Sequence, residues 1–152
     1  GRKHILYIIR EVLGFEPESR QTDLTVPLQY LTNAIKKRCT TFVLSDFIEE
    51  RNFKNALTIA NRKHDVVAIQ VYDKRVEELP DVGMMKMVDP ETGEDVYVDT
   101  SSRRVRALHR KWWIEGQVRL RDTFSKSGVD SISVRTDQDY VKALMNLFAK
   151  RN

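Results

Sequence analysis

Residues 64–73 read His64-Asp-Val-Val-Ala-Ile-Gln-Val-Tyr-Asp73, and this stretch decides the fold. Val66 to Tyr72 is a nearly continuous apolar run, which is typical of a strand that is buried on both faces of a parallel sheet. Thr40 to Leu44 is a second run of this kind, and an aspartate closely follows each run. The residues between them, 51–62, have helical spacing. Strand, helix and strand in this order predict a right-handed βαβ unit.

The segments on either side of this unit extend the same α/β pattern. Asp89-Pro-Glu-Thr-Gly93 is typical of the turn of a β-hairpin with a longer loop. Gly128 is placed to cap a long helix, and Thr136-Asp-Gln-Asp139 resembles a capping box at the start of a last helix. No repeat or linker interrupts the chain, so we expect one domain. The predicted ranges are helices at 3–13, from 23 or 25 to 38, and at 101–126, a hairpin of 84–88 with 95–99, and a third core strand at 129–134.

Helical spacing also assigns the faces that should turn inward. Trp112 and Trp113 are adjacent, so they point about 100° apart on a helix and one at most is central to the core. We expect one buried tryptophan and one partly covered by arginine stems. The inward stripes are predicted as Val105, Leu108, Trp112, Leu120 and Phe124 in the long helix, and Val141, Leu144, Met145 and Phe148 in the last helix.

Composition restricts the class of protein. The 152 residues are 41% hydrophobic and 32% charged, which is ordinary for a globular domain. No apolar run approaches the roughly 18–20 residues of a membrane span. A single cysteine, Cys39, cannot form an internal disulfide, so we expect a cytoplasmic location. The net charge of +4 comes from 26 bases and 22 acids interleaved along the chain, and it does not predict nucleic-acid binding.

Oxygen-bearing side chains lie where ligands of open α/β sheets bind, beyond the carboxyl ends of the strands. Asp46 and Asp73 follow two strands, and Thr22 precedes a helix nearby. Thr22 and Asp46 could together offer oxygen ligands to Mg²⁺. The alternative is structural: Thr22 or Asp23 caps the second helix, and Asp46 caps the helix after its strand.

Signatures of catalysis are sparse. The chain has no glycine-rich phosphate loop and no Gly-x-Ser-x-Gly elbow, and its three histidines are scattered. We therefore expect a protein that is not an enzyme. A metal-dependent hydrolase with Asp46 and Asp73 as ligands stays open as an alternative.

The long helix carries a second candidate surface. Basic residues surround its two tryptophans, and such interleaving can bind nucleic acid or another anionic partner. Arg106, Arg110 and Trp113 are the candidate partner surface. Two buried or half-covered tryptophans on an otherwise solvated helix are the alternative.

Several separated strings resemble, in the right order, a bacterial family catalogued as domain of unknown function 58. That family looks like a variant of the von Willebrand factor A domain, which implies a three-layer, Rossmann-like parallel sheet with an added hairpin and long helix. It also implies a protein partner, a MoxR-type AAA+ ATPase. The strings are residues 64–73, Glu78-Leu-Pro-Asp-Val-Gly83, Asp89-Pro-Glu-Thr-Gly93, Asp99-Thr-Ser-Ser102, Gly128-Val-Asp130 and Thr136-Asp-Gln-Asp-Tyr140.

The resemblance further implies a metal-ion-dependent adhesion site. Gln21-Thr22-Asp23-Leu24 matches the loop that gives a threonine ligand, and Leu44-Ser45-Asp46 matches the loop that gives an aspartate. The Asp-x-Ser-x-Ser segment of such sites is absent, so the chain resembles the C-terminal portion of a larger domain. Two oxygens do not hold Mg²⁺ firmly, and we expect no cofactor in this portion and Mg²⁺ in the full-length domain.

These observations predict an interaction module that works through protein partners. They also predict self-association. In an A-type sheet the strand at 40–44 would pair with a strand that is missing here, so it should be an edge with unpaired backbone groups. The helix at 3–13 should likewise expose apolar side chains. We expect a dimer joined through this edge.

Overall fold

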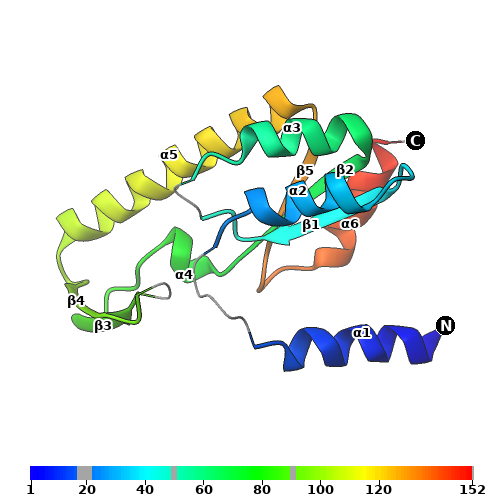
Figure 1. Ribbon diagram of the computed structural model, residues 1–152. Helices are drawn as coiled ribbons and strands as arrows, with labels where there is room; N and C mark the ends of the chain where they lie inside the picture. The colour runs from blue at the N-terminus through cyan, green and yellow to red at the C-terminus, as the bar shows by residue number, and fades with distance from the viewer. Residues whose placement is uncertain (17–21, 49–50, 90–91, 152) are drawn as a thin grey trace.

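The computed structural model describes residues 1–16, 22–48, 51–89 and 92–151 (Figure 1). Within these residues the chain alternates helices with strands, as the sequence predicts. The strands are β1 (Thr40–Ser45), β2 (Asp65–Tyr72), β3 (Met84–Val88), β4 (Asp95–Asp99) and β5 (Asp130–Arg135). The helices are α1 (Arg2–Gly14), α2 (Thr25–Ala34), α3 (Lys54–Lys63), α4 (Lys74–Glu77), α5 (Arg103–Ser127) and α6 (Tyr140–Ala149).

The core sheet is parallel, with the strand order β1-β2-β5. This confirms the predicted mixed α/β class. β2 is central because it pairs on both sides: Ala68 lies opposite Val43 of β1, and Ile69 lies opposite Ile132 of β5. The apolar run of residues 66–69 is buried, as a strand covered on both faces must be. β3 and β4 form a separate antiparallel pair.

Alternate residues of β2 pack into two different clusters. Val66 and Ala68 face α2, α3 and α5, where Leu28, Leu57 and Phe124 are buried. Val67 and Ile69 face the other way, toward β5 and α6. Figure 1 shows the same layers, with α2, α3 and α5 on one side of the sheet and α6 on the other.

Two predicted helix faces need correction. In α5 the buried tryptophan is Trp113, with 6% of its surface exposed, whereas Trp112 is 45% exposed. In α6 the buried residue is Leu147, with Leu144 partly buried, whereas Met145 is exposed. Both helices contact the sheet along only part of their length, so their spacing alone does not select the inward side.

α1 and β1 carry the exposed apolar surface that the sequence predicts. No residue of α1 is buried, and Figure 1 shows this helix standing apart from the rest of the chain. Among the described strands β1 has one neighbour, β2, so its other side is an edge. None of the described helices combines the length and the apolar character that crossing a membrane requires.

Candidate functional site

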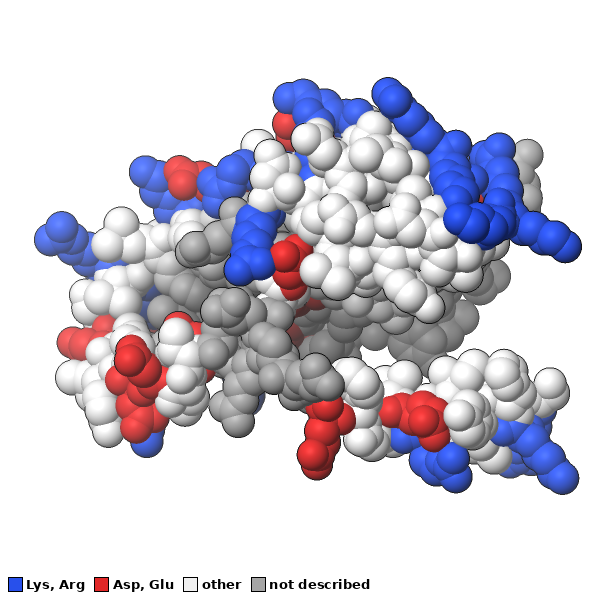
Figure 2. Space-filling model, in the orientation of Figure 1, with Lys and Arg blue, Asp and Glu red and all other residues white. Residues whose placement is uncertain are grey.

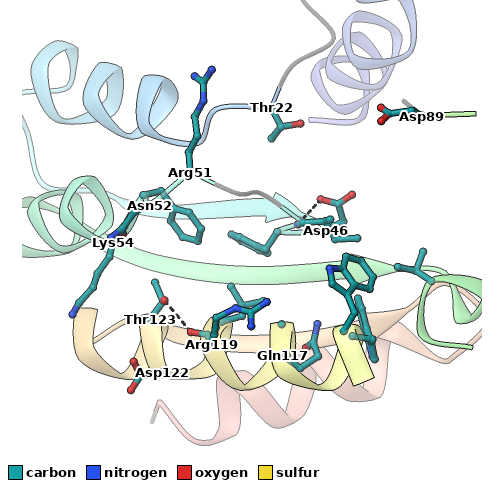
Figure 3. A pocket seen from close by; sticks show the side chains of 18 residues that line it. Thr22, Asp46, Arg51, Asn52, Lys54, Asp89, Gln117, Arg119, Asp122 and Thr123 are labelled. Carbon is teal, nitrogen blue, oxygen red and sulfur yellow. Dashed lines mark hydrogen bonds between the residues drawn. The ribbon is translucent and has the colours of Figure 1, made fainter. Parts of the chain in front are cut away.

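A cavity of about 1100 Å³ opens beyond the carboxyl end of β1, and we call it the carboxyl-end cavity. It brings together the turn after β1, the segment before α2, the start of α3 and the middle of α5. Thr22 and Asp46 both line it, as Figure 3 shows. Its other lining residues include Phe47, Arg51, Asn52, Lys54, Asp89, Trp112, Gln117 and Arg119.

The turn after β1 holds Asp46 at the cavity. Asp46 Oδ1 accepts a hydrogen bond from the Ile48 N–H at 3.1 Å, and Ser45 Oγ accepts from the Phe47 N–H at 3.0 Å. Phe47 has φ = 54°, a left-handed conformation that a bulky residue seldom adopts. Its side chain compensates by packing in the core, where its ring contacts the ring of Phe124 at 5.1 Å. The turn therefore fixes the Asp46 carboxylate outside the core and the next side chain within it.

A row of polar side chains under the cavity, of which Gln70 is the buried member, supports this turn. Ser45, Gln70 and Ser133 lie opposite one another on β1, β2 and β5. Gln70 is 1% exposed; its Nε2 donates to the Asp46 carbonyl at 3.0 Å and its Oε1 accepts from Ser133 Oγ at 2.8 Å. Because a buried amide is costly unless it is hydrogen-bonded, these contacts fix Gln70 and, through it, the position of Asp46.

Asp23 lies next to Thr22 but is not among the residues that line the carboxyl-end cavity. Its Oδ1 accepts from the Thr25 N–H at 2.9 Å at the start of α2, and its Oδ2 accepts from Arg51 at 2.7 Å. The Arg51 guanidinium, and then the Thr25 N–H, hold the pKa of the Asp23 carboxyl below its ordinary value. Asp23 is therefore the residue that supports the start of α2, and within the described residues the Thr22 hydroxyl has no hydrogen-bond partner.

Asp46 and Asp73, the aspartates that follow β1 and β2, differ in whether they cap the next helix. Asp46 does not cap α3, since Asn52 Oδ1 accepts from the Lys54 N–H at the start of that helix. Asp73 does cap α4, where its side chain accepts from the Arg75 N–H at 2.7 Å. The lining of the carboxyl-end cavity includes Asp46 but not Asp73, so the two carboxylates do not share this cavity.

The residues present supply only part of a magnesium shell. Thr22 and Asp46 offer a hydroxyl and a carboxylate, one oxygen of which already accepts from Ile48 N–H. Mg²⁺ prefers six oxygens in an octahedral arrangement. In the described part of the chain no group of three or more His, Cys, Asp or Glu side chains is arranged to hold a metal. The described residues therefore do not form a complete magnesium site.

The opposite wall of the cavity carries cations and an exposed indole. Lys54 and Arg119 line it, and neither forms an ion pair with any described residue. Trp112 lies in the same wall, nearly half exposed, with its ring 5.4 Å from that of His109. Figure 3 shows Arg119 and Gln117 across the cavity from Thr22 and Asp46. The cavity can thus offer a partner both an apolar contact and a positive charge.

In the predicted partner surface on α5, Trp113 is buried, although it lines the carboxyl-end cavity, and the two arginines are paired within the chain. Trp113 is buried against Tyr72, with the two ring centroids 5.0 Å apart. Arg106 donates to the Ser101 carbonyl at 3.0 Å and pairs with Asp81 at 3.0 Å. Arg110 forms an ion pair with Glu78. These arginines fasten α5 to the segments before it.

The charged side chains do not gather into one basic surface. On the face shown in Figure 2, Lys and Arg side chains lie in several separate groups, with acidic side chains between some of them. Within α5, Lys126 also pairs with Asp122 at 2.7 Å. A nucleic-acid footprint needs clustering on one face, and these observations do not favour it.

Sequence reasoning assigned Thr22 and Asp46 to one site and Trp113, which also lines the cavity, to a separate candidate surface, but it did not identify the other lining residues. Gln70 carried a usable signal, since an amide inside an apolar strand must find buried partners. Ser45 and Ser133 carried none, because their alignment depends on the sheet register. Lys54, Trp112 and Arg119 lie on α3 and α5, and only the packing of these two helices brings them to one cavity.

Comparison with known proteins places the chain in a family. The family model described as protein of unknown function DUF58 matches residues 1–119. Uncharacterized proteins of Mycobacterium bovis and Mycobacterium tuberculosis are each 29% identical over 159 residues, covering 99% of this chain and 48% of their own length. An uncharacterized protein of Mycobacterium avium is 27% identical over 141 residues, covering 89% of this chain and 79% of its own.

The chain spans about half the length of the first of these relatives. No solved structure matches it significantly. The family model covers well over half of the sequence, including α1, the βαβ unit, the hairpin and most of α5. The chain therefore belongs to the family described as protein of unknown function DUF58.

Proposed function

We propose that the chain is a non-enzymatic protein-interaction module that binds its partner at the carboxyl-end cavity. The observation that carries this proposal is the convergence of Thr22 and Asp46, from separate segments, on one open cavity. A buried amide of Gln70 holds the Asp46 turn in place. A site with a fixed carboxylate, a hydroxyl and a wall of adaptable polar and aromatic groups suits recognition of another protein's surface.

The charges of the cavity favour a partner that presents an acidic side chain. Lys54 and Arg119 are cations without an ionic partner in the described residues, so an incoming carboxylate gains their attraction. Asp46, together with Asp89 and Asp122 in the cavity lining, would repel such a group. In the full-length domain, the Mg²⁺ that the resemblance to von Willebrand A domains implies would be held in part by Thr22 and Asp46, and it would supply a positive charge that offsets this repulsion.

The partner implied by the same resemblance is a MoxR-type AAA+ ATPase. Isothermal titration of the chain with such an ATPase from the same genome tests the proposal. Arg119→Glu should weaken binding by at least about tenfold, since about 1.4 kcal/mol of lost attraction has that effect. Arg121→Glu is the matched control, because Arg121 is an exposed arginine on the same helix that does not line the cavity.

The acidic side of the cavity has its own test. In the longer protein with Mg²⁺ present, Asp46→Asn should weaken binding, whereas Asp95→Asn, at an exposed aspartate of the hairpin, should not. In the longer protein, removal of Mg²⁺ by EDTA should have the effect of Asp46→Asn and should add nothing to that variant. Unchanged affinity in both Arg119→Glu and Asp46→Asn would reject the cavity as the contact. The absence of any binding to the ATPase would reject this partner.

A further inference from the structure

α1 is an amphipathic helix whose apolar side is uncovered. At the 3.6-residue period of a helix its apolar side chains fall within a sector about 160° wide, which also holds Arg2 of the first turn, and Lys3, His4, Tyr7, Arg10 and Glu11 take the rest. No residue of the helix is buried. The apolar side chains are Ile5, Leu6, Ile8, Ile9, Val12 and Leu13, each between 46% and 81% exposed.

Such a helix is marginal by itself. α1 has 13 residues, and isolated helices of fewer than about 12–15 residues are barely stable in water. Most helical stability in proteins comes from packing an apolar face against another element. A helix whose apolar side chains gather on one face, interrupted by Arg2 in the first turn, is therefore suited to lie on an apolar surface.

The chain also carries a second uncovered apolar surface. A hollow of about 290 Å³ opens on the face of the sheet that α6 covers, and we call it the α6-face hollow. Phe42 extends it along the β1 edge, where its ring meets that of Phe148 edge-on at 6.1 Å. The hollow shares no lining residue with the carboxyl-end cavity. Its apolar lining is Leu44, Ile69, Val71, Val134, Tyr140 and Leu144.

This surface exists because the two faces of the sheet are covered unequally. Three described helices pack on one face, whereas α6 packs on the other against β2 and β5. β1 is therefore covered only in part: Phe42 meets the Phe148 ring of α6, yet Phe42 and Leu44 are still 43% and 65% exposed. Contiguous apolar surface of this kind is unusual on a stable monomer.

We propose that a second copy of the chain covers this surface, with α1 of each copy docked on the α6-face hollow of the other. The exchange is reciprocal, so it forms a closed two-fold dimer. The apolar face of α1 and the α6-face hollow are then covered in both copies. Six apolar side chains on α1 and a similar set on the hollow and the β1 edge then bury an area within the range of about 1,200–2,000 Å² that stable interfaces need.

The β1 edge favours exchange over docking of α1 on its own chain. Intramolecular docking would cover the stripe of α1 but leave the open edge of β1 at the rim of the hollow. In the exchanged dimer the two copies meet at this rim, so the edge is covered as well. This proposal is independent of partner binding at the carboxyl-end cavity.

Sedimentation equilibrium of the 152-residue chain, with complementation between two variants, tests the proposal. Val12→Glu places a charge on the apolar face of α1 and leaves the hollow unchanged. Leu44→Arg places a charge in the lining of the hollow and leaves α1 unchanged. We expect the unmodified chain to be a dimer and each variant alone to be a monomer whose far-UV circular dichroism spectrum loses no more than the helical signal of the undocked α1. Mixing the two variants should restore a dimer, because one intact α1 then meets one intact hollow.

Two control variants keep the result specific. His4→Glu lies on the polar side of α1, and Ile59→Arg replaces an exposed aliphatic residue on α3, away from the hollow. Both should remain dimers. The proposal is overturned by an unmodified chain that stays monomeric over about two orders of magnitude in concentration. It is equally overturned by a dimer that survives Val12→Glu, or by variants that stay monomeric when mixed.

Discussion

Phe47 combines an unfavourable backbone with favourable packing, and substitution can separate the two. It is the one described residue other than glycine with a positive φ, and its ring is buried beside Phe53 and Phe124. A left-handed conformation costs a residue with a Cβ about 1–2 kcal/mol, whereas glycine adopts it freely. The turn at Asp46 therefore depends on aromatic packing to hold a strained backbone.

This separation gives a prediction about Phe47→Ala and Phe47→Gly. Both lose the ring and should cost about 3–5 kcal/mol of the free energy of unfolding. Glycine should nevertheless be the less destabilising by about 0.5–1 kcal/mol, because it relieves the left-handed strain that alanine keeps. Urea unfolding of both variants measures the difference. A more stable alanine variant would show that the backbone at this position is not strained.

The rim of the cavity gives a prediction about pH. Arg51 holds the pKa of Asp23 below its ordinary value. Ionised Asp23 therefore contributes stability at any pH above the ordinary aspartate pKa, and this contribution is lost as the pH falls through the depressed folded pKa. In Arg51→Gln the largest cause of the shift is gone, so the folded pKa should rise toward its ordinary value. A carboxyl-detected NMR titration of Asp23 in the two proteins checks this, and an unchanged titration would contradict it.

Single residues differ in what the sequence reveals about them. Asp46 could be found because it follows an apolar run, and its place at the end of β1 follows from that run. The left-handed conformation of Phe47 could not, because no glycine or asparagine marks it. It arises from two local hydrogen bonds, Phe47 N–H to Ser45 Oγ and Ile48 N–H to Asp46 Oδ1, and from tertiary packing, none of which the sequence pattern shows.

At the scale of elements, the sequence predicts that a helix exists better than it predicts which side faces inward. α5 was expected at 101–126 and is found at Arg103–Ser127, capped by Gly128 as predicted. Its 25 residues extend well past the sheet, so its first turns face the hairpin region and its last turns face the core. A stripe drawn at constant period fits the last turns, where Leu120 and Phe124 are buried as predicted. It does not fit earlier in the helix, where Leu108 and Trp112 are exposed and Trp113 is buried instead.

The two tryptophans give a direct test of this correction. Trp113→Ala should cost about 3–5 kcal/mol of the free energy of unfolding, because its buried ring packs on Tyr72. Trp112→Ala should cost much less, since nearly half of its surface already faces solvent. In single-tryptophan proteins, acrylamide should quench the fluorescence of Trp112 more strongly than that of Trp113. The reverse order of quenching would restore the original assignment.

At the scale of the whole molecule, the βαβ unit determined most of what could be predicted. Two apolar runs with a helix between them predict a parallel pair of strands. The third run joins this pair at β2, which gives the order β1-β2-β5. Which charged side chains line a common cavity does not follow from the order of strands and helices. The wall formed by Lys54 and Arg119 depends on how α3 and α5 meet, and the sequence records no sign of that contact.

The contribution of α1 to stability is also a property of the whole molecule. In a single copy α1 buries no residue, so deleting residues 1–21 should leave the unfolding free energy of the remaining fold nearly unchanged. In an exchanged dimer the same deletion removes the interface. The urea midpoint of the full chain should then rise with protein concentration, because dissociation accompanies unfolding, whereas the midpoint of the shortened chain should not. Unfolding at several concentrations, followed by circular dichroism, measures both. If the full and shortened chains share one concentration-independent midpoint, α1 joins no second copy. If the shortened chain is far less stable at every concentration, α1 instead packs within its own chain.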